Sequence, residues 1–503
     1  MPFYSRFALE YYKQGKTEDA ITVLKGGLAK ARANDLTSKV PLLNLLAGIS
    51  VQKAKVATVS GTATERDIQL QMAATLLTES EKISREDPRT FLVKGLLAMV
   101  RRSPDQALQQ FNLALRLNPT CVASLLGKAR VLFSKRQFQT ALGIYQRVLT
   151  LRPNDKPDPR IGIALCLMKL GHAKDARRAL ERAIEVDERA VAPYVLLATM
   201  DLNAAKRLMD PRLNAQLDAG KLEEALAEGG SLLSSAMAQL KLAYERQPAN
   251  AAVLTRLADR LFYSNDYEGA RRLGERALKT ADTLAIQAEA HFQVARAHHA
   301  MRRFDLAFDA YQKSLQHNEQ HALARFGLGQ MQLQRTDMSS AEATFQRVLE
   351  KHPKCVEVLR ALGYLHARLP NNKAKAVEYY EKEMQAVADE AGEQAKRQGG
   401  DGDVAAWFDD ANLFLEAGLL YEGTSARKAR KAYSMAAAIL QRQGAGDQLP
   451  ELWSNLGALR QLAGDDREQI FAEYDNAVQK CTALLESARA RLGDKSGGRA
   501  AHD

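Results

Sequence analysis

The sequence predicts an all-α fold, a right-handed superhelical solenoid of about twelve antiparallel helix pairs. Three observations predict it. A pattern of small and large residues recurs at a constant interval along most of the 503 residues. Helix-breaking residues are few, with 14 Pro and 31 Gly, whereas Ala and Leu are abundant. Hydrophobic residues make up 46% of the chain, which is enough for a continuous core.

The repeating pattern is a small residue, a large residue four positions on, a small residue seven on and Pro twelve on. It is complete at Ala107, Phe111, Ala114 and Pro119. Copies with Pro also begin at Ala141, Ala236 and Ala341, and weaker copies without Pro begin at Ala20, Ala176, Ala270, Ala307, Ala376 and Ala429. From Ala107 to Ala141 is 34 residues, which is the period of the tetratricopeptide repeat.

A first helix precedes each of these second helices and carries its own small residue 12 or 13 positions earlier. Two antiparallel helices approach to about 8–10 Å only where the side chains at their crossing are small. Gly15, Gly171 and Gly464 stand at the turn inside a unit, where we expect left-handed backbone. The small residues of the first helices are Ala8, Gly95, Ala129, Ala164, Ala198, Ala258, Ala295, Gly329, Gly363, Ala417 and Gly457.

The domain organisation predicted from this pattern is one solenoid over residues 1–490. Breaks in the alanine period predict irregular loops near 56–66, 203–230 and 389–403, the last being acidic and rich in Gly. The second unit, around 41–88, is the most irregular. Residues 491–503 are expected to be a disordered tail.

Charge and cysteine content limit the cellular setting. The net charge of +11 is spread along the chain, which indicates solvated helix faces first and a polyanion-binding surface second. The densest basic cluster, at 427–431, fits an exposed helix face better than a nuclear-localisation signal. The 4 Cys form no paired motif, so a reducing compartment is expected. No stretch is long and apolar enough to predict a membrane span.

The sequence contains no motif of a catalytic or cofactor-binding site. A Walker loop, GxGxxG, GxSxG, HExxH and paired CxxC motifs are all missing, so no enzyme, cofactor or metal is predicted. His291 and His298 share a helix face, but packing is the stronger interpretation of that spacing. Cys121 and Cys166 are interpreted as small core residues.

The predicted functional surface is a concave groove lined by the first helices, at positions three before, one after and four after each small residue. Those positions are unusually apolar in units three to six, which indicates a partner-binding site. The alternative is that a tight superhelix packs them against neighbouring turns. The candidate groove residues are Leu92, Leu96, Met99, Leu126, Arg130, Phe133, Ile161, Leu165, Met168, Val195, Thr199, Leu202, Phe326, Gln330 and Leu333.

Four segments go beyond the generic repeat. They are LLGKARVLFSKRQFQTALGIYQRVL at 125–149, PDPRIGIALCLMKLG at 157–171, RAHHAMRRFDLAFDAYQKSL at 296–315 and LARFGLGQMQLQRTD at 323–337. In these segments the chain resembles the tetratricopeptide scaffold subunit of the RNA polymerase II-associated factor (PAF) complex. PDPRIGI and RFGLGQ are the most specific stretches, and the resemblance extends from about residue 3 to 440.

The resemblance implies a nuclear scaffold that is not an enzyme. It would bind the namesake and other subunits of the PAF complex, and so act indirectly on RNA polymerase II and chromatin. The family supports transcription elongation and co-transcriptional histone modification, and its amino-terminal repeats clasp an extended segment of the namesake subunit. Family members continue into a highly charged tail and have residues ahead of the first repeat. This leaves open a fragment, a divergent form or a truncated chain.

Two other classes of protein are alternatives to this scaffold. A cytosolic adaptor or co-chaperone is disfavoured, because no three consecutive units offer the Lys and Asn pairs that hold a carboxyl-terminal carboxylate. The regulatory array of a sugar transferase would need a catalytic domain downstream. Direct nucleic-acid binding stays open because of the charge, although aromatic residues that stack on bases are scarce in the groove.

Overall fold

The computed structural model describes residues 2–30, 37–60, 63–210, 219–369, 372–398, 408, 410–422 and 425–442. Over these ranges the regular structure is helical, with 22 α-helices and one short 3-10 helix, Thr37–Lys39. The chain divides into two compact units. The first comprises Met1–Asn203, Leu233–Met301 and Gln316–Asn318, and the second comprises Ala204–Leu232, Arg302–Leu315 and the described residues from Glu319 on.

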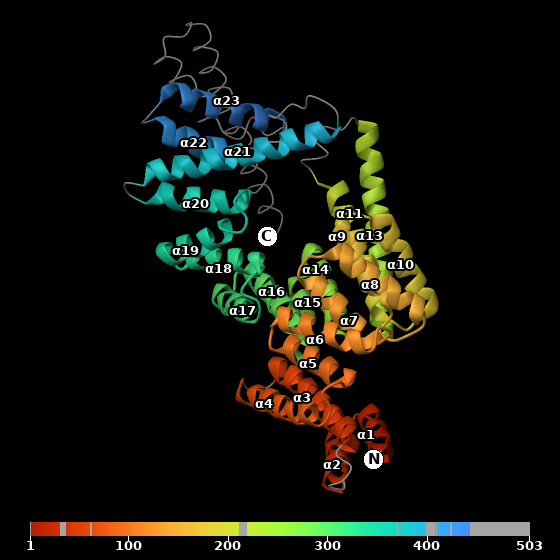
Figure 1. The fold of residues 1–503 in the computed structure, drawn as a ribbon. Coiled ribbons are helices and arrows are strands. Elements are labelled where there is room, and N and C mark those ends of the chain that lie inside the picture. The colour runs from red at the N-terminus through yellow and green to blue at the C-terminus, as the bar shows by residue number, and fades with distance from the viewer. Residues whose placement is uncertain are drawn as a thin grey trace, which may run out of the picture. The chain divides into compact units, whose positions relative to one another are not determined.

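The first unit is a stack of antiparallel helix pairs, in which successive helices pack against each other (Figure 1). Its helices are α1 (Pro2–Lys13), α2 (Thr17–Ala29), α3 (Val40–Ser60), α4 (Ala63–Ile83), α5 (Pro88–Val100), α6 (Pro104–Leu117), α7 (Val122–Ser134), α8 (Phe138–Leu151), α9 (Pro159–Leu170), α10 (Ala173–Val186), α14 (Ala251–Tyr263), α15 (Tyr267–Thr280) and α16 (Leu284–Ala300). Two further helices, α11 (Val191–Leu208) and α13 (Ala219–Arg246), contribute residues to both units, and α17 (Phe304–His317), most of which is in the second unit, contributes its last two residues to the first.

The second unit repeats the arrangement with α18 packed on α19, α20 on α21, and α22 on α23. Its helices are α17 (Phe304–His317), α18 (Ala322–Gln334), α19 (Met338–Leu349), α20 (Val356–Arg368), α21 (Lys373–Gln398), α22 (Ala411–Glu422) and α23 (Ala426–Arg442). The predicted fold class, a solenoid of tetratricopeptide helix pairs, is confirmed. The twelfth pair, expected around Gly457, lies outside the described residues, as do Gly464 and the tail at 491–503.

The small and large positions of the repeat pack as the pattern predicts. A Cβ atom added to Gly95 would lie 2.6 Å from the ring of Phe111, and one added to Gly127 would lie 2.5 Å from the same ring. Phe111 is fully buried, so the ring is wedged between the first helix of its own unit and that of the next. The glycines are required there because any side chain would displace the ring.

Five of the turns that join the two helices of a repeat pair have left-handed backbone without a glycine. Gly15 and Gly171 have φ of 79° and 86°, which confirms the prediction for those two turns. In other units the same conformation is adopted by Arg102, Arg136, Asn265, Arg302 and Thr336, with φ between 58° and 62°. Left-handed backbone costs an L-residue with a Cβ about 1–2 kcal/mol. The amides of Ser103 and Gln137, one residue further on, bond back to Ala98 O and Leu132 O at 2.9 and 3.0 Å, which closes the end of each first helix.

The predicted irregular loops are wrong for most of their residues, because helices continue into them. α3 extends through Ser60 and α4 begins at Ala63, and within α3 the hydroxyl of Thr58 is satisfied by donating to Ala54 O at 2.8 Å. α21 covers most of the loop expected at 389–403. It continues to Gln398 because Ala391 is buried against α20 and Asp389 pairs with Lys354 at 2.8 Å.

Helix also replaces much of the loop predicted at 203–230. α11 continues to Leu208, and α13 begins at Ala219. The sequence KLEEALAE at 221–228 consists of strong helix formers, which outweigh the Gly pair that follows. Gly229 also has a packing role, since a Cβ there would lie 2.7 Å from Met209. Residues 61–62, 211–218 and 399–403 lie outside the described part.

Candidate partner-binding groove

The predicted groove residues of the first unit lie on α5, α7, α9 and α11, the first helices of four successive pairs. On each helix the small residue at the crossing (Gly95, Ala129, Ala164 and Ala198) is buried. Residues three before, one after and four after it fall on one side of the helix, because a turn has 3.6 residues. The groove chemistry is therefore set by about three side chains per unit.

On α5 and α7 the groove residues are partly accessible. Leu92 and Met99 pack with one side against the buried cluster that contains Phe111, and Leu96 is 38% exposed. Leu126 is half-buried and Arg130 is exposed. Phe133 stacks edge-to-face on Phe138, with ring centroids 5.2 Å apart, which fixes its orientation.

On α9 and α11 the same partial burial recurs. Ile161 and Leu165 are half-buried, while Met168 packs against the cluster around Leu180. Val195 and Leu202 also contact the core with part of their surface. Thr199 donates its hydroxyl to Val195 O at 2.7 Å, so its methyl group is left for contact with other groups. The row is thus continuous and apolar apart from Arg130 and Thr199.

In the second unit the predicted residues Phe326, Gln330 and Leu333 lie on α18. Phe326 and Leu333 pack against the buried cluster around Phe345, and the rings of Phe326 and Phe345 are 5.7 Å apart. Gln330 is half-buried. These side chains have the same mixed character as those of the first unit.

An ion pair at the equivalent positions of α14 and α16 was not predicted. Asp259 and Arg296 each follow the small residue of their helix by one position, and Arg296 Nη2 lies 2.5 Å from Asp259 Oδ1. The guanidinium also lies 4.1 Å from the ring centroid of Phe262 and 5.5 Å from that of Phe292. Applying the same spacing rule for groove positions to the seventh and eighth helix pairs would have identified all four residues.

A second ionic group anchors α11 from outside the groove. Asp201 is buried, pairs with Arg177 of α10, and accepts a hydrogen bond from Ser235 Oγ of α13 at 2.8 Å. A buried carboxylate needs such partners, because removing it from water is costly. This group fixes α11, and with it Val195 and Leu202, in the row.

The specific PDPRIGI stretch forms a helix start. Asp158 accepts a hydrogen bond from Arg160 N at 2.9 Å, and Arg160 Nη1 donates to Asp158 Oδ1 and Pro153 O at 3.1 and 2.8 Å. This arrangement caps α9 and holds the chain that leads into it. Ile161 lines a hollow of about 640 Å³ beside this cap, together with Pro193 of α11.

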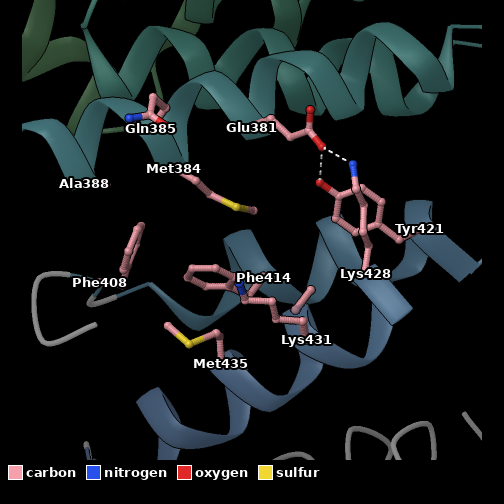
Figure 2. Close-up of a pocket in the computed structure, with 11 residues that line it drawn as sticks. Glu381, Met384, Gln385, Ala388, Phe408, Phe414, Tyr421, Lys428, Lys431 and Met435 are labelled. Carbon is pink, nitrogen blue, oxygen red and sulfur yellow. Dashed lines mark hydrogen bonds and ion pairs between the residues drawn. The ribbon is translucent and has the colours of Figure 1, made fainter. Parts of the chain in front are cut away.

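The second unit contains an apolar hollow of about 680 Å³ between α21, α22 and α23 (Figure 2). Met384, Phe408, Phe414 and Met435 point toward it. At one end, Glu381 accepts hydrogen bonds from Tyr421 Oη at 2.8 Å and from Lys428 Nζ at 2.9 Å. These two hydrogen bonds, of which the one from Lys428 has the larger effect, hold the pKa of the Glu381 carboxyl below its usual value. Lys428 belongs to the basic cluster at 427–431, which lies on α23 and so is a helix face.

Other predicted site residues have structural surroundings. Cys166 is buried, and burial raises the pKa of its thiol to about 11, so it stays protonated as a core residue. Cys121 is half-buried at the start of α7 and receives a hydrogen bond from Ser124 Oγ at 3.3 Å. The ring of His291 stacks on that of His317 at 5.4 Å.

Among the described residues, no group of three or more His, Cys, Asp or Glu is placed to hold a metal ion. No helix in those ranges is long and apolar enough to cross a bilayer.

Comparison with known proteins confirms the repeat. Models of the tetratricopeptide repeat match residues 92–156, 132–200 and 298–365. The chain is 30% identical over 374 residues to Tetratricopeptide repeat protein 1 of Schizosaccharomyces pombe, covering 73% of this chain and 34% of that protein.

Two further relatives carry more informative names. The chain is 28% identical to Protein CTR9 homolog of Arabidopsis thaliana, covering 93% of this chain and 39% of the relative. It is 25% identical to RNA polymerase-associated protein CTR9 of Caenorhabditis elegans, covering 91% and 37%. The chain therefore spans between about a third and two fifths of the length of these curated relatives. The resemblance to the scaffold subunit is confirmed.

Proposed function

We propose that this relative of the CTR9 proteins is a non-enzymatic scaffold that binds other subunits of the PAF complex in the nucleus. In that role it supports transcription elongation by RNA polymerase II and co-transcriptional histone modification. The observation that carries the proposal is the row of half-buried apolar side chains from Leu92 on α5 to Leu202 on α11. We call the apolar side chains of this row the apolar groove; they are Leu92, Leu96, Met99, Leu126, Phe133, Ile161, Leu165, Met168, Val195 and Leu202.

The apolar groove suits an extended protein segment better than a small molecule. Its side chains lie on the first helices of four successive pairs, and neighbouring packed helices are about 8–10 Å apart, so the contacts form a line. Most of these side chains are half-buried, so they are held in place before a partner arrives and lose little conformational entropy on binding. The occupant is expected to be an extended segment of the complex's namesake subunit, with apolar side chains at matching intervals.

The proposal is tested by capture of partners from nuclear extract. The tagged 503-residue chain should recover PAF-complex subunits, and Leu126→Asp with Leu165→Asp should abolish that recovery, because two charges would be buried beneath the bound segment. Far-UV circular dichroism should remain helical. The matched control is Leu117→Asp with Leu151→Asp, since these leucines are 42% and 40% exposed at the ends of second helices.

Three results would count against the groove or the scaffold. Loss of helicity in the Leu126 and Leu165 variant would show that these side chains belong to the core. Equal loss of partners in the control variant would show that the groove is not the site. Recovery of chaperones or ribosomal factors in place of PAF-complex subunits would favour a cytosolic adaptor.

A further inference from the structure

Three consecutive turns of the first unit carry an excess of exposed cations. They connect α5 to α6, α7 to α8 and α9 to α10, and their only exposed acidic side chains are Asp105 and Asp175. We define the basic edge as their exposed basic residues, which are Arg101, Arg102, Lys135, Arg136, Lys169, Lys174 and Arg178.

The three turns are neighbours in space. Lys135 Nζ of the second turn lies 2.5 Å from Asp105 Oδ1, at the start of the helix that follows the first turn. Leu132 and Phe133 at the end of α7 pack in the same cluster as Leu170 at the end of α9. The cations therefore form one row, because each helix end contacts that of the next unit.

Most of this charge is not neutralised within the unit. Among the described residues, Arg102, Arg136, Lys169 and Lys174 form no ion pair. Asp105 pairs with Lys135, and Asp175 lies 3.7 Å from Arg178. Arg101 donates to Leu70 O at 3.3 Å, which fixes its guanidinium without cancelling its charge. The row therefore presents a net positive surface.

Arg102 and Arg136 are at positions where glycine would be less strained. Their φ angles are 58° and 61°, and the equivalent positions in two other turns of the unit are Gly15 and Gly171. Glycine adopts this backbone without strain, so replacing either arginine by glycine removes its charge without straining the turn. The two arginines occur in adjacent turns, and both side chains are exposed.

We propose that the basic edge binds the phosphate backbone of double-stranded DNA. A guanidinium matches phosphate with two parallel hydrogen bonds, and the row is arginine-rich. Three turns at the usual helix spacing extend over roughly 20 Å, which is about six base pairs of a rigid duplex. A single strand would need aromatic side chains for its bases, and the aromatic ring of these turns, Phe138, is half-buried against Phe133.

The basic edge is distinct from the apolar groove, so the two proposals can fail separately. The groove residues Leu126 and Leu165 lie in the middle of their helices, whereas the basic edge lies at helix ends. The Leu126→Asp and Leu165→Asp variant should keep its DNA affinity, and loss of the cations should leave recovery of protein partners unchanged.

The test measures binding of the full chain to a fluorescent duplex of random sequence across a salt series. Arg102→Gly with Arg136→Gly should weaken binding by roughly tenfold at low salt and reduce the log–log salt slope by about 2. The same variant should melt at an equal or higher temperature, because glycine adopts this backbone without strain. A merely structural role for the arginines would lower the melting temperature instead. Arg102→Gln with Arg136→Gln serves as a second variant should the glycine pair not fold.

The control removes the same charge elsewhere. Arg116→Gln with Arg189→Gln changes two exposed arginines near the turns between units, and it should alter affinity by less than about twofold. Equal weakening by this control would overturn the proposal in favour of diffuse attraction. Wild-type binding by the arginine variants would also overturn it. Tighter binding of a single strand, or of polyglutamate, through the same arginines would assign the basic edge to a different partner.

Discussion

The groove of the first unit is built in two ways on one scaffold. From α5 to α11 its positions hold half-buried aliphatic and aromatic side chains, whereas on α14 and α16 the corresponding positions hold the Asp259–Arg296 pair. The small residues beneath are alike, since Ala129, Ala258 and Ala295 are all fully buried. The repeat therefore fixes where the groove residues point, and only their chemistry differs. The side chains of the apolar region are mostly half-buried with no ionic partner, whereas the charged groups of the ionic region are paired with each other.

Removing Phe111 should break the apolar region. Phe111→Ala deletes the ring between Gly95 and Gly127, and it should cost about 3–5 kcal/mol of unfolding free energy, measured by urea denaturation. Leu92 and Met99 pack on the same cluster, so partner recovery should fall as well. The comparison variant in the ionic region is Val294→Ala, beside Gly274, which should cost about 1–2 kcal/mol. A loss of unfolding free energy below 1 kcal/mol for Phe111→Ala would contradict the packing of this ring between Gly95 and Gly127.

Removing the carboxylate should break the ionic region by a smaller amount. Asp259→Ala leaves the Arg296 side chain, which is only 11% exposed, without its ion pair. We expect a loss of about 2 kcal/mol by thermal or urea unfolding. Arg296→Met in the same chain should restore most of it, because no unpaired charge remains. A double-mutant cycle without coupling would show that the pair is not formed in solution.

The ionic arrangement recurs in the second unit, where titration can detect it. Arg360 occupies a groove position of α20 and lies 2.7 Å from Glu383 Oε1 and 2.5 Å from Asp410 Oδ2. Glu383 is buried, and desolvation raises the pKa of its carboxyl to about 7 despite the attraction of Arg360.

A raised pKa in the folded state means that the folded chain binds this proton more tightly than the unfolded chain does. The stability contribution is therefore present below about pH 4.5 and lost as the pH rises to about 7. Glu383→Gln should remove this part of the pH dependence, measured by urea unfolding between pH 5 and 8. Glu378→Gln, at an exposed position of the same helix, is the control. A wild-type pH profile in Glu383→Gln would contradict the assignment.

The sequence was sufficient for the repeat and the core, because these depend on local spacing. The small residues, the wedge residues and the two glycine turns could be read directly. Helix ends were predicted less well, since the stabilising contacts of α21 come from α20 and Lys354, which are separate in the chain. The arginines in left-handed turns gave no signal, because residue type alone indicates glycine there. The Asp259–Arg296 pair could be predicted only by comparing two groove positions that are 37 residues apart in the sequence.

The wedge of Phe111 has a consequence for how units can be exchanged. The ring of Phe111 is accommodated by glycines on two helices, and at the next junction the ring of Tyr145 packs against one glycine, Gly162. By contrast, Leu180 contributes to a junction that contains Ala164 and Ala176. A unit transplanted between junctions of the two kinds would bring a ring against a methyl group or leave a void. Helix pairs of this array can therefore be shuffled, duplicated or redesigned only next to neighbours whose small residues fit the large side chain at the junction.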